Sequence, residues 1–69
     1  MAKYYYEFDG IEVMRNYFPD HESAFRDAME TSKIMLRKKM VQGNEITAKI
    51  YCEENGNVFE VDKITTTMV

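Results

Sequence analysis

Three acidic side chains near the N-terminus are the first candidates for chemistry. Glu7, Asp9 and Glu12 surround an Asp-Gly pair, and carboxylate oxygens that converge at a turn are able to bind a cation. A calcium loop needs more oxygen ligands at a defined spacing, however, and this segment lacks that spacing. We therefore interpret the three carboxylates as a solvated turn and expect no bound metal.

The side chains that usually carry catalysis are scarce. His21 is the single histidine and Cys52 the single cysteine, so the sequence offers neither a histidine-based metal site nor a cysteine with a neighbouring base. The three glycines are all explained by turns or by a helix end, which leaves none for a phosphate-binding loop. We predict that the protein is not an enzyme and that it holds no cofactor.

Composition and charge narrow the class of protein. The chain of 69 residues is long enough for one domain, residues 1–69, and its hydrophobic fraction of 45% is typical of a folded globular protein. The net charge of −3 disfavours binding to nucleic acid, which needs a basic surface. A single cysteine and the lack of an apolar run near the ~20 residues of a membrane span favour a cytoplasmic protein that does not enter a membrane.

Residues 2–17 are predicted to form a first β-hairpin. Tyr4, Tyr6 and Phe8 recur at every second position, which is the period of a strand with one buried face. Asp9-Gly10 is a strong signal for a two-residue type I′ turn, in which both central residues need positive φ. We expect a second strand to follow this turn and to pair with the first.

A helix is predicted from His21 to Gln42. Asp20 is a good N-cap and Gly43 is suited to close the C-terminal end. Ile34 and Val41 fall on the side of the helix opposite to the apolar stripe. The stripe, which should pack on the sheet, consists of Phe25, Ala28, Met29, Ser32, Met35, Leu36 and Met40.

Glu45 to Val69 is predicted to form a second hairpin that turns at Asn55-Gly56, the other type I′ signal. The expected inner-face pairs are Cys52 with Phe59 and Ile50 with Val61. The alternation slips after Asp62, so we expect a β-bulge or the end of pairing near Lys63.

Together these elements predict an α+β domain with the order ββαββ. Two hairpins would form one antiparallel sheet, and the amphipathic helix would pack on one face. The predicted core residues are Phe25, Leu36, Ile50, Phe59 and Val61.

The same residues resemble a known family. The aromatic strand and turn of residues 4–10, the Phe18-Pro19-Asp20 helix start and the hairpin turn of residues 53–58 resemble a family of short uncharacterised bacterial proteins. Members of that family combine an aromatic N-terminal strand, an Asp-Gly turn, a Pro-Asp-capped helix and a C-terminal hairpin. The family has no established activity, so the resemblance implies a fold and no function.

The function that the sequence favours is a non-catalytic protein-interaction module. A small phage-encoded or accessory protein that modulates a host protein fits the size and charge, and the partner would be another protein or a second copy. An open sheet face would carry apolar side chains, which indicate a partner when they form a patch. The expected interaction residues are Tyr5, Met14, Ile34, Val41, Tyr51 and Val58.

The sequence leaves two alternative functions open, RNA binding and ligand binding. Tyrosines on a sheet can stack on RNA bases, and a cluster of Lys3, Arg15 and Lys49 around Tyr5 and Tyr51 would favour that function. A pocket lined by acidic residues such as Glu7 or Glu12, or by His21, would instead favour a ligand-binding module.

Overall fold

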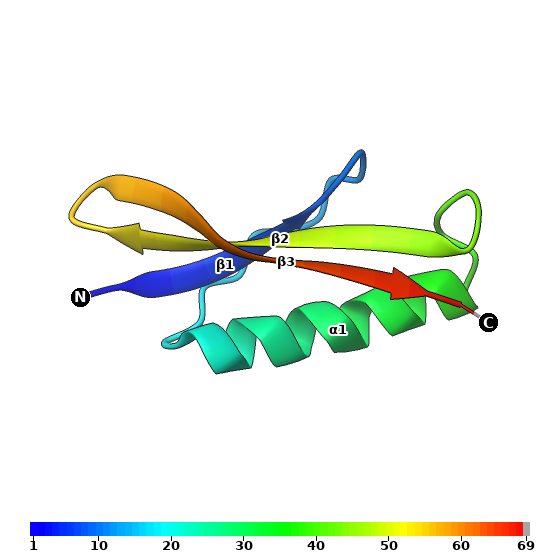
Figure 1. Cartoon of the computed structure of the whole chain (residues 1–69), viewed down its shortest axis with the longest axis horizontal. Coiled ribbons are helices and arrows are strands. Elements are labelled where there is room, and N and C mark those ends of the chain that lie inside the picture. Colours follow the sequence, from blue (N-terminus) through cyan, green and yellow to red (C-terminus); the bar gives the residue numbers. More distant parts are fainter. Residues whose placement is uncertain (69) are drawn as a thin grey trace.

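The computed structural model describes residues 1–68 and contains one helix and three strands. In chain order these are β1 (Lys3–Phe8), α1 (His21–Arg37), β2 (Glu45–Glu54) and β3 (Asn57–Thr67). The strands form one antiparallel sheet in the order β1-β2-β3, and α1 packs against one of its faces (Figure 1). The predicted α+β class is confirmed, but the ββαββ order is wrong, because the described residues contain one strand fewer.

The missing strand is the one expected after Asp9-Gly10. The Ile11 N–H donates to the Phe8 carbonyl at 3.4 Å, so the turn does form. Gly10 has a φ of 73°, but Asp9 does not share the positive φ that a type I′ turn requires. A turn with only its second central residue at positive φ splays the two arms apart. The chain therefore leaves the sheet, and β1 pairs with β2 instead.

The N-terminal end of α1 follows the sequence prediction. Asp20 is the N-cap, and its Oδ1 accepts a hydrogen bond from the Ser23 amide at 2.7 Å. This bond satisfies one of the amides that the first turn of a helix leaves without a partner. It also holds the Asp20 pKa below its ordinary value, because the amide stabilises the carboxylate form.

The C-terminal end of α1 comes five residues earlier than predicted. Lys39 takes a left-handed φ of 56°. Its N–H donates to the Leu36 carbonyl, and the Met40 N–H donates to the Met35 carbonyl at 2.9 Å. These two bonds define a Schellman motif, which ends a helix whatever the later sequence favours. Met40 is consequently exposed instead of continuing the buried stripe.

Replacing Lys39 by Gly is expected to stabilise the protein. A left-handed conformation costs an ordinary residue about 1–2 kcal/mol, whereas glycine adopts it freely but loses more chain entropy on folding. The net expectation is an increase of about 0.5–1 kcal/mol in the free energy of unfolding, measured by urea denaturation. Lys38→Gly, at the neighbouring position with a φ of −86°, serves as the control and should destabilise.

The core lies between α1 and the inner face of the sheet. Leu36 and Ile50 are buried as predicted, while Phe25 is partly buried and packs at the margin of the core. The Tyr6 hydroxyl reaches the surface of this core and donates to Asp27 at 2.6 Å. The buried cluster consists of Tyr6, Phe8, Ala24, Ala28, Met35, Leu36, Ile46, Ala48 and Ile50.

Phe59 and Val61 are not core residues, which corrects the sequence prediction. Phe59 does pair with Cys52, as expected, but 53% of its surface is exposed, and Val61 is 45% exposed. Val61 does not face Ile50, because Asp62 takes that position, and Phe59 is exposed because the hairpin is long. The β2–β3 turn projects beyond the start of α1 (Figure 1), so no helix covers the inner face there.

A β-bulge interrupts β3 two residues earlier than expected. Ile50 faces Asp62 and Tyr51 faces Glu60, which leaves Val61 as the extra residue. The turn itself agrees with the prediction, since Asn55 and Gly56 have φ values of 52° and 81°, as in a type I′ turn. After the bulge the alternation is restored, and Lys63 lies on the outer face of the sheet opposite Lys49.

Candidate functional site

A cluster of aromatic rings occupies the outer face of the sheet, on the side away from α1. Tyr5 on β1 stacks against Tyr51 on β2, with 5.2 Å between the ring centroids, and Tyr17 meets Tyr5 edge-on at 5.5 Å. The guanidinium of Arg15 lies 4.1 Å from the centre of the Tyr5 ring. Only 5% of Tyr5 is exposed. The expectation that Tyr5 belongs to an open surface is therefore wrong, because the 11–17 segment folds back over it.

The basic residues around this cluster are all paired with carboxylates. The contacts are Lys3 with Glu53 at 3.3 Å, Arg15 with Glu7 at 3.4 Å and Lys49 with Asp9 at 3.7 Å. Lys3 also lies over the ring of Tyr17. The arrangement brings together the cations and tyrosines that RNA binding would use. Each cation is already neutralised, however, and the buried Tyr5 ring is not available for stacking on a base.

Burial of the tyrosines leads to a prediction about alkaline pH. Burial is the main cause that raises the pKa of Tyr5 and of Tyr6 above the ordinary value of 10.0, and the hydrogen bond to Asp27 raises that of Tyr6 further. Because these pKa values are raised in the folded state, their contribution to stability is complete below pH 10.0 and is lost as the pH rises through the folded-state values. The urea midpoint should fall above that pH, and it should fall less in a Tyr5→Phe/Tyr6→Phe variant.

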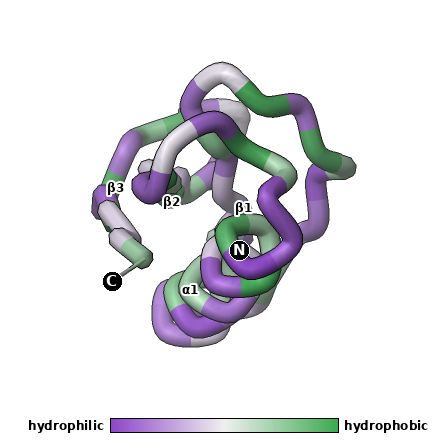
Figure 2. Tube along the Cα trace, turned by 90° about the vertical axis from the view of Figure 1, so that its right-hand side faces the viewer, coloured by the Kyte–Doolittle hydropathy of each residue, from purple (hydrophilic) through white to green (hydrophobic). Residues whose placement is uncertain are grey.

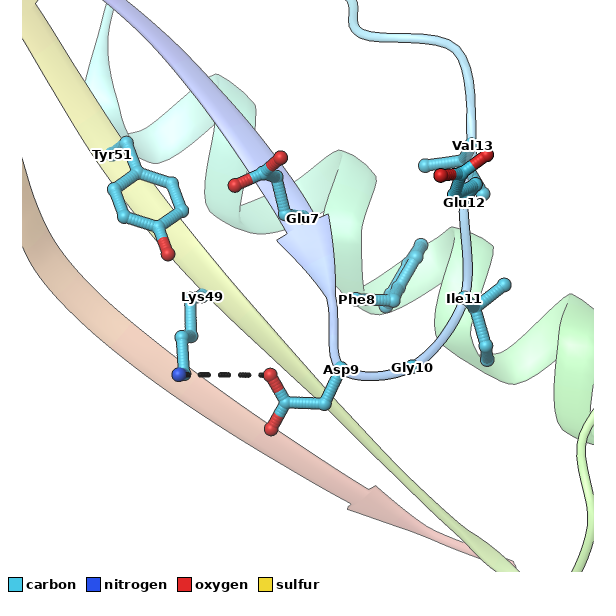
Figure 3. A pocket seen from close by; sticks show the side chains of 9 residues that line it. All are labelled: Glu7, Phe8, Asp9, Gly10, Ile11, Glu12, Val13, Lys49 and Tyr51. Atoms are coloured by element: carbon cyan, nitrogen blue, oxygen red, sulfur yellow. Dashed lines mark ion pairs between the residues drawn. The ribbon is translucent and has the colours of Figure 1, made fainter.

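A pocket of about 460 Å³ opens between the β1 turn and the outer face of β2. Figure 3 shows Glu7 between Tyr51 and Glu12, with the Lys49–Asp9 ion pair at the lower margin. The acidic residues do line one cavity, as a ligand-binding site would require. Among the residues that the structure describes, however, no three acidic, histidine or cysteine side chains converge closely enough to hold a metal ion.

The other expected interaction residues do not form one surface. Met14 is exposed on the 11–17 segment over the outer face, and Ile34 is exposed on α1, which covers the inner face. Val41 is partly buried against the core, so its predicted place on the far side of the helix is wrong. Its position changes because the helix ends before it, and the chain then turns back towards the sheet. Tyr51 is half-buried within the aromatic cluster, where it stacks on Tyr5.

The largest exposed apolar group on a regular element lies on β3. Val58 on the outer face, Phe59 on the inner face and Val61 at the bulge each expose about half of their surface, and we call these three residues together the β3 patch. Strand β3 has a neighbour on one side only, and Figure 2 shows it at the left margin of the sheet with no segment beyond it. Val58 was expected to be exposed, but sequence alternation places Phe59 and Val61 in the core. The signal that could have revealed them is the ten-residue length of β2, which exceeds what the helix can cover.

His21 has a structural position at the start of α1. Its Nε2 lies 3.1 Å from the Asp62 carboxylate on β3, and its ring stacks on Tyr4 and meets Phe25 edge-on. These contacts hold the first helical turn against the sheet. Cys52 is buried on the inner face of β2, near the hairpin turn and opposite Tyr4, whose pKa it raises by a hydrogen bond. Among the described contacts, His21 therefore pairs with Asp62 and does not contact the Cys52 thiol.

Comparisons with models of protein families, with curated proteins and with solved structures find no match to this chain. The resemblance to a family of short bacterial proteins therefore stays a prediction. No helix among residues 1–68 has the length and apolar character needed to cross a bilayer.

Proposed function

We propose that the protein is a non-catalytic protein-interaction module and that it binds its partner along β3. The observation that carries this proposal is an eleven-residue edge strand with one unpaired side and three large, half-exposed apolar side chains. A small domain buries little apolar surface in its core. Exposing Val58, Phe59 and Val61 to water is therefore unfavourable in the free chain and indicates that a partner covers them.

The chemistry of such an edge is strand addition. The free side of β3 presents main-chain N–H and C=O groups in a row, and these groups can pair with a strand of another molecule. Backbone hydrogen bonds then supply affinity, and alternate side chains supply specificity. Phe59 adds an aromatic side chain, which is the type of residue that often dominates the binding energy of an interface.

The size and charge of the chain agree with a regulatory rather than an enzymatic role. A chain of 69 residues with a net charge of −3 has room for one such surface beside its core. We propose that it acts in the cytoplasm as a small accessory or phage-encoded modulator of a host protein. Its effect would follow from occupying a surface and not from chemistry on a substrate.

The test compares two variants that place the same charge at different exposed sites. Phe59→Glu introduces a carboxylate into the β3 patch, and Met14→Glu introduces one on the 11–17 segment, where the side chain is also exposed. Tagged parent and variants are cross-linked in extract of the native source, and captured proteins are identified by mass spectrometry. Loss of the partner with Phe59→Glu but not with Met14→Glu is expected. Equal capture by all three proteins would overturn the proposal.

A second candidate function is favoured by the pocket. Asp9 is paired with Lys49 and Glu7 with Arg15, whereas Glu12 has no ion pair among the described contacts. The charge suits a small organic amine. Putrescine should then raise the melting temperature of the parent and should do so less for Glu12→Gln. An identical response of the two proteins would remove this candidate.

A further inference from the structure

We infer that the partner at β3 is a second copy of the same chain, paired antiparallel about a two-fold axis between Val61 and Asp62. The inference rests on the proposed function in one respect, which is that β3 is the interaction site. It goes further by naming the occupant and the register of the pairing. The β-bulge of β3 determines this register.

The bulge determines which side chains of β3 share a face of the sheet. Glu60 lies opposite Tyr51 and Lys63 lies opposite Lys49. Tyr51 and Lys49 are two residues apart on β2, so they point to the same face. Glu60 and Lys63 therefore both lie on the outer face, although they are three residues apart.

The inner face follows the same logic. Phe59 lies opposite Cys52 and Ile64 lies opposite Ala48, and both of these β2 residues are buried on the helix side. Without the bulge, residues three or five positions apart on β3 would point to opposite faces. Because of the bulge, Glu60 and Lys63 share the outer face, and Phe59 and Ile64 share the inner face.

A two-fold axis between Val61 and Asp62 would bring complementary side chains of the two copies opposite each other. It places Glu60 of each copy opposite Lys63 of the other copy, which makes two ion pairs on the outer face. It also places Phe59 opposite Ile64 on the inner face, twice. Directly opposite residues in an antiparallel pair must lie on one face of the sheet, and only the bulged strand satisfies that condition for these pairs.

The charges on β3 favour a second copy over an unrelated strand. A lysine and a bulge on an edge strand are both features that discourage pairing with other chains. Within one chain, Lys63 lies opposite Lys49, a like-charge pair that is unfavourable. The Glu60 carboxylate of a second copy would supply the missing counter-charge. A generic strand would instead meet Lys63 without a partner.

The resulting dimer would contain one continuous sheet with both helices on the same face. Phe59 of each copy, which no helix of its own chain covers, would lie beside Ile64 of the other copy, and Ile64 packs at the margin of that copy's core. The apolar surface removed from water there would enlarge a core that is thin in a domain of this size.

Charge reversal and charge exchange test this inference by sedimentation velocity from micromolar to submillimolar concentration. Glu60→Lys and Lys63→Glu each turn both ion pairs into like-charge pairs. Each variant alone should dissociate at least about tenfold more readily than the parent. An equimolar mixture of the two should form a heterodimer as readily as the parent forms its homodimer, because both pairs are again of opposite charge. Two matched controls on the exposed face of α1, Glu30→Lys and Lys33→Glu, should leave the association unchanged.

Each outcome decides the inference. Association of the parent, its loss in both variants and its recovery in the mixture support it. A parent that stays monomeric, a mixture that does not recover, or controls that weaken association equally would overturn it. The proposed function is tested separately by the Phe59→Glu capture experiment, and equal capture by all proteins would overturn it. If the parent is monomeric but Phe59→Glu still loses a captured partner, the dimer inference fails and the proposed function stands, with a different protein bound at β3.

Discussion

Replacing Ile50 by Ala is expected to lower the free energy of unfolding by about 2–5 kcal/mol. Ile50 is on the central strand and is completely buried, so the substitution leaves a cavity that the surrounding core fills only in part. A domain of this size has a total stability of roughly 3–10 kcal/mol, so the substitution should remove a large part of that stability. Urea denaturation followed by circular dichroism measures the change.

Phe59→Ala is the matched comparison for this prediction. Because 53% of Phe59 is exposed, the substitution should change the stability of the monomer by no more than about 0.5 kcal/mol. Both variants are measured at a protein concentration low enough to keep the chain monomeric. If Phe59→Ala proves as destabilising as Ile50→Ala, Phe59 belongs to the core and the β3 patch does not exist.

Replacing Tyr5 by Ala is expected to cost about 3 kcal/mol, the second largest effect. The substitution removes a ring that stacks on Tyr51, that Tyr17 meets edge-on and that the Arg15 guanidinium covers. Each aromatic pair contributes about 0.5–1.5 kcal/mol beyond the burial of area, and the cation–π contact adds to this. The 11–17 segment should also lose its place on the sheet.

Two measurements distinguish this prediction from a simple loss of strand propensity. Proteolysis within the 11–17 segment should become faster in Tyr5→Ala, because the segment is no longer held. Tyr5→Phe keeps the ring and should behave like the parent in both denaturation and proteolysis. An unchanged rate of cleavage in Tyr5→Ala would show that Tyr5 does not anchor the segment.

The parts of the fold that local signals determine were predicted correctly from the sequence. Asp20 caps the helix and Asn55-Gly56 forms the β2–β3 turn, because each depends on the conformational preferences of one or two residues. The first hairpin was not predictable in the same way. Asp9-Gly10 is compatible with more than one turn type, and the φ of Asp9 decides whether the following residues pair or leave the sheet.

The candidate site was harder to predict than the fold. Alternation places Phe59 and Val61 on one face with Ile50. It reveals neither how far the helix extends over Phe59 nor that the β-bulge puts Asp62 opposite Ile50 in place of Val61. The helix end at Lys39 was also hidden, since lysine does not favour the left-handed conformation and Gly43 offered a better local signal. The β3 patch arises from these tertiary relations between elements and not from any motif.

Amide NMR spectra over a series of protein concentrations test most directly the claim that β3 is the interaction site. Chemical shifts are expected to change with concentration mainly at residues 57–66, and the amides on the free side of β3 should become protected from exchange with solvent. In Glu60→Lys the same changes should require a protein concentration at least about tenfold higher than in the parent. Spectra that are independent of concentration, or changes centred on Ile34 or the aromatic cluster instead of β3, would contradict it.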